Sequence, residues 1–110
     1  MENCIFCKIA NKEIPSNIVY EDENTVAFKD LNPQAPVHVL AIPKKHYSSL
    51  NEIDDKNIAG SLLLAAKQTA QKLGITDYRT VINTGKEAGQ EVFHIHLHIL
   101  AGRPLKWPPG

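Results

Sequence analysis

Three histidines alternate with aliphatic residues in one segment near the end of the chain, His94-Ile95-His96-Leu97-His98-Ile99-Leu100. On a β-strand, side chains two residues apart share a face, so this segment would place three imidazoles in a row about 7 Å apart. The aliphatic residues would then face an apolar core. Imidazole suits proton transfer, nucleophilic attack and metal binding near neutral pH. The segment therefore predicts a chemically active strand over residues 94–100, the alternative being a half-buried strand with a histidine-rich solvent face.

A glycine-bearing loop, Gly85-Lys86-Glu87-Ala88-Gly89-Gln90, precedes the histidines. Glycine lets backbone N–H groups approach an anion closely, so this loop predicts a phosphate cradle beside the imidazoles. It is not a P-loop, because the GxxxxGK[ST] pattern is absent and a strand follows instead of a helix. Taken alone, the loop is an ordinary turn. Attack by one imidazole on a phosphoryl group held there would give a covalent phosphohistidine intermediate.

The cysteines, Cys4 and Cys7, are separated by two residues, a spacing at which two thiolates can share a metal ion. Structural zinc takes four ligands, so two further donors would be needed. A thioredoxin-like redox pair is less favoured, because no strand precedes the cysteines. The third interpretation is a pair of small, half-buried free thiols.

The elements that position these groups follow from periodicity and predict an α+β fold. Its mainly antiparallel five-stranded sheet would carry one long helix and a short N-terminal helix around Ile5, Phe6 and Ile9. The long helix is expected over residues 56–73, ending before Gly74. The expected strands are residues 18–21, 25–29, 37–42, 79–83 and 94–100.

Composition predicts one domain spanning residues 1–110, since 43% of the residues are hydrophobic and the formal net charge is zero. A neutral chain argues against a nucleic-acid partner, which would need a basic face. No apolar run approaches the roughly 20 residues that span a bilayer, and no secretory signal is evident. Two closely spaced free cysteines fit a reducing compartment. We therefore expect a cytoplasmic protein that binds neither nucleic acid nor membrane.

These motifs together resemble the histidine triad nucleotide-binding proteins, and the resemblance covers nearly the whole chain. Beyond the histidine segment, the matching parts are Phe28–Pro36, His38, Ile42–His46, Asn83–Gly85, Gly89–Gln90 and Trp107–Gly110. The resemblance implies the histidine triad fold and a homodimeric purine nucleoside phosphoramidase without an organic cofactor. Such a hydrolase would cleave the P–N bond of adenosine or guanosine 5′-phosphoramidates through a nucleotidyl-histidine intermediate, giving the nucleoside monophosphate. A partner subunit would also cover the aromatic ring of Trp107.

The resemblance also implies roles for individual residues. The catalytic group would include His94. Within this group, His96 would be the nucleophile and His98 would contact the phosphate. His38, or a nearby backbone carbonyl, would bond the other ring nitrogen of His96 and fix its tautomer. Asp30 would hold the ribose hydroxyls, the alternative being an exposed turn aspartate. Phosphate contacts are expected from Asn83, Gly89, Gln90, Glu91 and Val92, and purine contacts, or plain core packing, from Ile5, Phe6, Ile9, Phe28, Leu31 and Leu40.

One departure from the family pattern concerns Glu91, which stands where some relatives carry a serine that contacts the phosphate and the leaving group. A carboxylate there would repel phosphate unless it points elsewhere or pairs with a base. The cysteine pair is the other departure, since some relatives lack it. Related branches of the superfamily bind zinc at positions that match Cys4, Cys7, His46 and His94. The resemblance thus implies a structural zinc that the phosphoramidase chemistry does not require.

Other functions remain open from the sequence. In a zinc hydrolase, His94, His96 and His98 would all bind one catalytic metal. A dinucleoside polyphosphate or acyl-nucleotide hydrolase would use the same histidines on a different leaving group. A nucleotide-binding scaffold would bind tightly and hydrolyse only incidentally.

Overall fold

A five-stranded sheet forms the centre of the computed structural model, which describes residues 3–110. Its strand order is β1-β2-β3-β5-β4, and every neighbouring pair is antiparallel. The strands are β1 (Ile18–Glu21), β2 (Thr25–Lys29), β3 (Val37–Pro43), β4 (Arg79–Val81) and β5 (Leu97–Ala101); the helices are α1 (Ile5–Ala10) and α2 (Lys56–Lys72), with 3₁₀ turns η1 (Leu50–Glu52) and η2 (Lys86–Ala88). The predicted α+β class, with a long helix and a short one, is confirmed. Residues 1 and 2 of the predicted domain lie outside the described residues.

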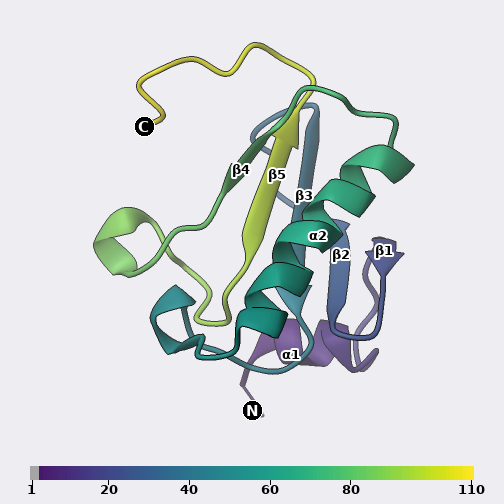
Figure 1. The fold of residues 1–110 in the computed structure, drawn as a ribbon, viewed down its shortest axis with the longest axis vertical. Helices are drawn as coiled ribbons and strands as arrows, with labels where there is room; N and C mark the ends of the chain where they lie inside the picture. The colour runs from purple at the N-terminus through teal and green to yellow at the C-terminus, as the bar shows by residue number, and fades with distance from the viewer. Residues whose placement is uncertain (1–2) are drawn as a thin grey trace.

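Helix α2 covers one face of the sheet, lying across β1, β2, β3 and β5 (Figure 1). Asp55 caps its start by accepting a hydrogen bond from the backbone of Asn57 at 2.8 Å. Gly74 follows its end with φ of 71°, the left-handed conformation that glycine adopts easily. The apolar side of α2 packs with alternate strand residues in the main core, which includes Ala27, Val39, Ala41, Leu62, Ala66, Ile95, Leu97 and Ile99.

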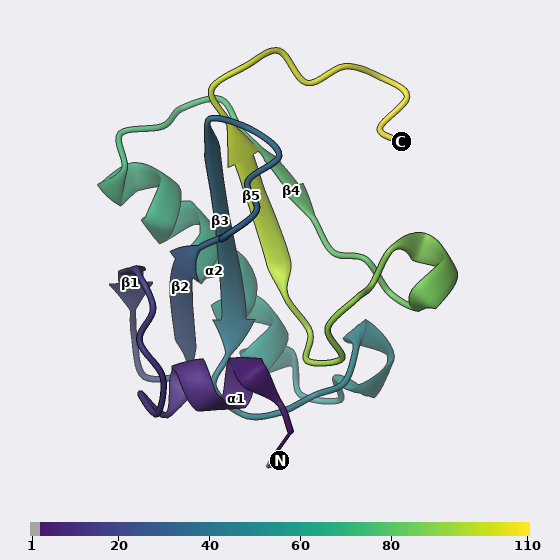
Figure 2. The same cartoon turned by 180° about the vertical axis from the view of Figure 1, so that it is seen from behind.

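Helix α1 lies against the opposite face, over the lower end of the sheet (Figure 2). Cys4 begins this helix, and its sulfur accepts a hydrogen bond from the Cys7 amide at 3.3 Å. The helix buries a second apolar cluster of Phe6, Ile9, Ala10, Val26, Phe28, Leu40 and Ile42. Above α1, the same face of the sheet carries His38 and His98, because the sheet register pairs Leu40 with His98 and His38 with Leu100.

The predicted strand over residues 94–100 is wrong at its start, because β5 begins only at Leu97. Upstream of that residue the Ile95 amide donates to the carbonyl of Tyr47 at 2.8 Å instead of joining the ladder. Pro43, at the end of the neighbouring strand β3, has no N–H with which to extend the pairing. The expected alternation survives without the ladder, since Ile95, Leu97 and Ile99 are all in the main core.

The other predicted elements need smaller corrections. The strand expected over residues 79–83 ends at Val81, the strand expected to end at 42 includes Pro43, and the long helix ends at Lys72. Within residues 3–110, neither helix has the length and apolar content that crossing a bilayer requires.

Candidate active site and metal centre

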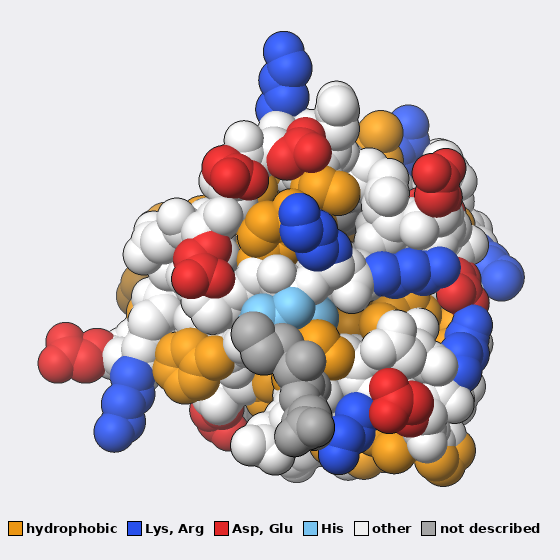
Figure 3. Space-filling model, turned by 90° about the horizontal axis from the view of Figure 1, so that it is seen from below, with side chains coloured by type: hydrophobic (Ala, Val, Ile, Leu, Met, Phe, Trp, Pro, Cys, Tyr) orange, Lys and Arg blue, Asp and Glu red, His pale blue; other side chains and the backbone are white. Residues whose placement is uncertain are grey.

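The three histidines gather on the sheet face opposite α2, where Phe6 of α1 packs against two of them. The Phe6 ring meets the His94 ring edge-on at a centroid distance of 6.0 Å and the His96 ring at 5.2 Å. The centroids of His96 and His98 are 5.0 Å apart, closer than the spacing expected for a flat strand. Histidine side chains reach the surface of the molecule when it is seen from below, among apolar side chains (Figure 3).

His96 has its proton position set by a backbone carbonyl. Its Nδ1 lies 2.9 Å from the carbonyl oxygen of His94, which can only accept, so Nδ1 carries the hydrogen. In the neutral ring, Nε2 then holds the free electron pair. Among the hydrogen bonds of the described residues, none involves this Nε2. His96 therefore presents an unprotonated, unoccupied nitrogen, which is what a nucleophile requires.

In His98 the hydrogen is on Nε2 instead of Nδ1, because two successive hydrogen bonds connect its ring to the backbone of Gln34. The Gln34 amide donates to Nδ1 of His38 at 3.0 Å, so the hydrogen of neutral His38 is on Nε2. That Nε2 lies 2.8 Å from Nδ1 of His98 and donates to it. His98 therefore carries its own hydrogen on Nε2, a buried atom without a partner among the described residues. A buried, unused N–H beside the free nitrogen of His96 suits an anionic oxygen.

Of the two partners expected for the far nitrogen of His96, the structure shows the backbone carbonyl, because His38 bonds His98 instead. The register explains the difference: His38 on β3 is diagonal to His98 on β5, whereas His96 lies upstream of the ladder. The role of orienting His96 falls to the backbone of His94. Asp30 completes the group around His38, with Oδ2 at 3.4 Å from its Nε2.

The ring charges are consistent with these tautomers. Burial, aided by the neighbouring His96 and His38, lowers the pKa of His98 to about 4. Burial also lowers the pKa of His38, although the Asp30 carboxylate opposes that shift. Both rings are therefore neutral at pH 7, and each has one donor nitrogen and one acceptor nitrogen.

The glycine loop adopts the conformations its sequence predicts, with φ of 92° at Gly85 and 99° at Gly89. The amides of both loop residues expected to contact phosphate are used within the loop, because Gly89 donates to the Lys86 carbonyl at 3.0 Å and Gln90 to the Gly85 carbonyl at 3.1 Å. The predicted phosphate contacts through these two amides are therefore not available in this conformation. The hydrogen bonds of the described residues include none from the amides of Glu91 or Val92, which leaves these two as the candidate donors.

The side chain of Gln90 is buried and ties three segments together. Its Oε1 accepts from the Gly85 amide at 2.9 Å, while its Nε2 donates to the carbonyls of Ser48 at 2.7 Å and Val92 at 3.1 Å. Gln90 thus holds the glycine loop and the segment leading to the histidines against the loop after β3. The structure gives it a positioning role that the sequence did not suggest.

The remaining predicted site residues divide into those near the histidines and those in the apolar cluster. Asn83 approaches Gly89, whose position for a Cβ would lie 3.6 Å from the Asn83 amide nitrogen. Glu91 is exposed. Of the six residues expected around a purine, Phe6, Ile9, Phe28 and Leu40 are buried together, whereas Ile5 is 49% exposed and Leu31 is fully exposed.

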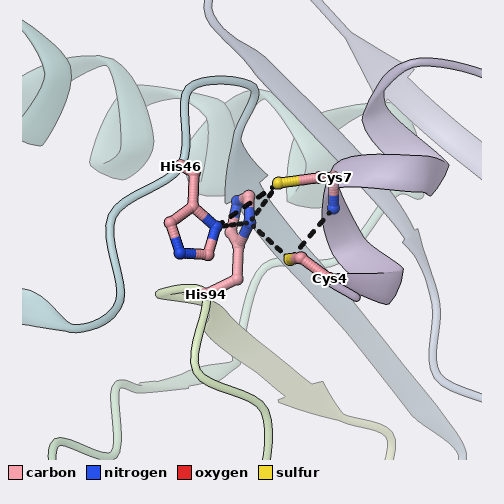
Figure 4. Close-up of side chains that lie close together, drawn as sticks. All are labelled: Cys4, Cys7, His46 and His94. Carbon is pink, nitrogen blue, oxygen red and sulfur yellow. Dashed lines mark hydrogen bonds between the residues drawn. The ribbon is translucent and has the colours of Figure 1, made fainter. Parts of the chain in front are cut away.

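A second cluster, formed by Cys4, Cys7, His46 and His94, lies directly beside the triad (Figure 4). The His94 Nδ1 lies 3.3 Å from the Cys4 sulfur, 3.5 Å from the Cys7 sulfur and 3.2 Å from the His46 Nδ1. The Cys7 sulfur is also 3.3 Å from the His46 Nδ1. The four ligands of a tetrahedral zinc ion stand about 3.3–3.8 Å from one another, so the cluster needs little adjustment to bind a metal.

The proton positions in this cluster also suit a metal. His94 donates from Nε2 to the carbonyl of Pro43 at 2.8 Å, so its Nδ1 faces the cysteines with a free electron pair. Burial lowers the pKa of His94 to about 4, which keeps the ring in the neutral, metal-binding form. In the absence of a cation, burial and the Cys4 thiol raise the pKa of Cys7 to about 11. A divalent ion would supply the charge that the thiolates require.

A second set of donor atoms, from Asp30, His38 and His98, also lies close together, but its protons do not suit a metal. The Gln34 amide occupies Nδ1 of His38, so Nε2 must keep the hydrogen that a metal would have to displace. The zinc hydrolase considered from the sequence meets a similar obstacle. Both ring nitrogens of His94 are directed away from a common site with His96 and His98, toward the cysteines and Pro43.

Two groups that set histidine tautomers were not predicted from the sequence, because they are backbone atoms. The Gln34 amide sets the tautomer of His38, and the Pro43 carbonyl sets that of His94. No residue type marks such a role, since every residue offers a carbonyl and all but proline offer an amide.

Comparison with known proteins agrees with the fold and the site. The HIT domain family matches residues 11–105, so the chain belongs to the HIT family of histidine triad proteins. It is 59% identical to an uncharacterized HIT-like protein of Synechocystis sp., an alignment that covers 99% of this chain and 98% of the relative.

Two solved structures are also similar. A HIT family hydrolase from Legionella pneumophila superposes with a TM-score of 0.93 at 50% identity, covering 98% of this chain and 100% of that one. A histidine triad nucleotide-binding protein from Candida albicans superposes with a TM-score of 0.84 at 34% identity, covering 96% of this chain and 83% of that one.

Proposed function

We propose that this HIT protein is a nucleotide hydrolase, and specifically a purine nucleoside phosphoramidase with His96 as its nucleophile. The observation that carries the proposal is the pair of tautomers: a free electron pair on His96 Nε2 beside a buried, unused N–H on His98. The similar proteins from Legionella pneumophila and Candida albicans, described as a hydrolase and a nucleotide-binding protein, support the general class.

The reaction proceeds in two displacements at the α-phosphorus. His96 Nε2 forms a bond to phosphorus as the P–N bond breaks, and the amine leaves with a proton taken from solvent water. Positive charge that develops on the His96 ring is stabilised by the His94 carbonyl at Nδ1. His98 donates to a phosphate oxygen, as an oxyanion-hole donor does, and the amides of Glu91 and Val92 supplement it. Water then cleaves the nucleotidyl-His96 bond and releases the nucleoside monophosphate.

The rest of the substrate has a place beside these groups. The apolar cluster of Phe6, Phe28 and Leu40, with Ile9 below, adjoins the histidines and would receive the purine. Ile5 and Leu31, which are exposed, would form the rim of that site. Asp30 holds Oδ2 close to His38 and would bind the ribose hydroxyls, while Asn83 would contact the phosphate.

The decisive variant is His96→Gly, with Gln71→Ala, on the exposed side of α2, as the control outside both the phosphate site and the metal cluster. We expect His96→Gly to lose at least about a thousandfold in turnover of adenosine 5′-phosphoramidate, the scale seen when a nucleophile is removed, while still binding adenosine monophosphate. Gln71→Ala should keep its full turnover. Faster cleavage of dinucleoside polyphosphates or acyl-nucleotides would assign the enzyme to that class instead. Tight binding with negligible turnover would identify a scaffold.

We also propose that Cys4, Cys7, His46 and His94 bind one structural zinc ion. All four positions would be filled by protein, so no metal-bound water remains for catalysis. Elemental analysis of protein purified without chelator should find close to one zinc per chain. The double variant Cys4→Ser/Cys7→Ser should contain no zinc and should melt at a lower temperature. Free cysteines of this kind suit the reducing cytoplasm, where we place the protein.

A twofold homodimer completes the proposal. Helix α2 lies over β1, β2, β3 and β5 but not over the edge strand β4, and the outward residues Leu63 and Leu64 of this helix are each 60% exposed. Tyr78, just before β4, is exposed, as is Trp107, at 82%. Exposed apolar side chains of this size, together with the unpaired edge of β4, favour a second copy of the chain as their cover.

A further inference from the structure

The cysteine pair is arranged so that its two sulfurs can reach each other. Cys4 has an extended backbone and Cys7 lies within the first turn of α1, where the Cys7 amide donates to the Cys4 sulfur at 3.3 Å. All four ligand atoms of the cluster lie within 4.8 Å of one another. Both cysteines are only partly buried and neither is in a disulfide. Small oxidants can therefore reach the sulfurs without unfolding the domain.

This pair is also connected to the proposed nucleophile through one residue. The His94 side chain faces both sulfurs through Nδ1, and the His94 backbone carbonyl accepts the hydrogen of His96 Nδ1 at 2.9 Å. A movement of His94 thus changes the bond that fixes the tautomer and orientation of His96. Among the described residues, His94 alone is hydrogen-bonded both to the sulfurs, through its side chain, and to His96, through its carbonyl.

We propose that Cys4 and Cys7 are a redox-modification site, at which a peroxide converts the zinc-binding dithiolate into a disulfide, expels the metal and thereby disables His96. The catalytic part of this inference rests on the proposed function, whereas the formation of the disulfide and the loss of metal do not. His94 is then a positioning residue that passes the state of the cysteines to the nucleophile.

The chemistry balances with hydrogen peroxide as the oxidant. One thiolate attacks a peroxide oxygen, the O–O bond breaks, and a sulfenic acid forms with release of hydroxide. The second thiolate attacks that sulfur, forming the S–S bond and releasing a second hydroxide. Two electrons pass from the two sulfurs to the peroxide, and two protons convert the hydroxides to water. The disulfide carries no negative charge, so it no longer binds the cation.

Loss of the metal leaves two histidine nitrogens facing each other without the cation that both would bind. Nδ1 of His46 and Nδ1 of His94 face each other at 3.2 Å, and with Nε2 of His94 bonded to Pro43 its Nδ1 has no hydrogen to offer. Two facing electron pairs repel unless a cation or a proton lies between them. Without the metal, the His46 ring must therefore carry its hydrogen on Nδ1 and donate it to His94, or the two rings must separate. Either change alters the contacts that hold the His94 ring in place. The His96 hydrogen bond to the His94 carbonyl is the first catalytic contact affected.

The test uses the zinc-loaded, reduced full-length chain treated with a small excess of hydrogen peroxide. We expect the loss of two titratable thiols, a mass decrease of two hydrogens (about 2 Da), and release of one zinc to a chromophoric chelator, all with the same time course. Imidazole ¹⁵N shifts of His96 should change with them, and turnover of adenosine 5′-phosphoramidate should fall at least tenfold. A thiol reductant with added zinc should restore every signal.

Cys7→Ser is the matched control, because it keeps one thiol but cannot form the disulfide within the chain. It should show no loss of two hydrogens and no reductant-reversible change in the His96 shifts. The inference is overturned if peroxide leaves both thiols and the zinc in the wild-type chain, or if the disulfide forms while the His96 shifts and turnover stay unchanged. If the reduced protein hydrolyses no nucleotide, the proposed function fails, and thiol, zinc and His96 shift measurements still decide the redox site.

Discussion

At the scale of single residues, the three triad histidines differ in which ring nitrogen is free to act. Three backbone groups cause this difference, because each one fixes the position of a ring hydrogen. The Pro43 carbonyl turns the free nitrogen of His94 toward the cysteines, and the His94 carbonyl leaves Nε2 of His96 free. The Gln34 amide acts through His38 to place a donor on Nε2 of His98. Three side chains of one type are thus prepared for the three roles we propose: metal ligand, nucleophile and phosphate donor.

The Gln34 relay can be tested by removing one backbone hydrogen. Gln34→Pro deletes the N–H that bonds Nδ1 of His38, whereas Gln34→Ala keeps it. Losing this hydrogen bond, worth about 1–1.5 kcal/mol, should lower kcat roughly tenfold and let the proton of His38 move to Nδ1. Turnover and imidazole ¹⁵N shifts measure the two effects. Equal turnover and equal ¹⁵N shifts in the proline and alanine variants would show that the Gln34 amide does not set the tautomer of His38.

A pH dependence of stability follows from His98, whose pKa is lowered by burial to about 4. In the unfolded chain its pKa is near 6.5, so below that pH the unfolded state binds a proton that the folded state refuses. This contribution to stability is complete above about pH 6.5 and is lost as the pH falls toward 4. Urea unfolding between pH 7 and 4 should therefore show a shallower loss for His98→Gln than for wild type. Identical slopes would contradict the buried neutral ring.

At the scale of elements, local sequence patterns predicted most of the structure. Apolar periodicity and the caps at Asp55 and Gly74 are local signals, and the α2 helix follows them within one residue. The start of β5 was not predictable in the same way. It depends on Pro43 across the sheet and on the Tyr47 carbonyl, neither of which is visible in the histidine segment itself.

The site was predicted unevenly for the same reason. The residue types in the catalytic group and the Cys4–Cys7 pair are conspicuous in sequence, and the structure brings these groups together. The partner of His96 was expected to be either His38 or a nearby backbone carbonyl, and only the folded chain shows that it is the carbonyl of His94. Gln90 was expected to face the substrate, but the three segments that its amide joins meet only in the folded chain.

Gln90 therefore gives the prediction at this scale. Gln90→Ala removes three hydrogen bonds from a buried amide and leaves the Gly85 amide and Ser48 carbonyl unpaired. We expect a loss of about 2–3 kcal/mol in unfolding free energy and a raised KM for the nucleotide, since the loop beside the phosphate site loosens. Gln71→Ala, on the exposed side of α2, is the control and should change neither quantity. If Gln90→Ala changed neither the unfolding free energy nor KM, the loop would keep its position without this side chain.

At the scale of the whole molecule, the sheet has one face covered by α2 and the other shared between α1 and the histidines. The triad histidines thereby lie on the opposite face from the long helix. In the proposed dimer, the surface around β4 and the outer side of α2 would receive the second copy, away from the cluster of Cys4, Cys7, His46 and His94 at α1.

The dimer predicts a specific effect of charge on α2. Leu63→Glu/Leu64→Glu places two carboxylates on the exposed apolar surface and should convert the dimer to a monomer at micromolar concentration, measured by light scattering. Leu50→Glu, at an exposed position in η1, is the matched control and should stay dimeric. Wild-type protein that is already monomeric at this concentration would refute the dimer itself.

The covalent intermediate is the central claim, and rapid quenching tests it most directly. Wild-type enzyme mixed with adenosine 5′-phosphoramidate labelled in the nucleotide should yield, within the first turnover, protein carrying one nucleotidyl group per active chain. Peptide mapping should place the label on His96, whose Nε2 is the free nitrogen, and His96→Gly should trap none. Full turnover with no labelled protein at any quench time, and complete dependence on added metal, would contradict the account.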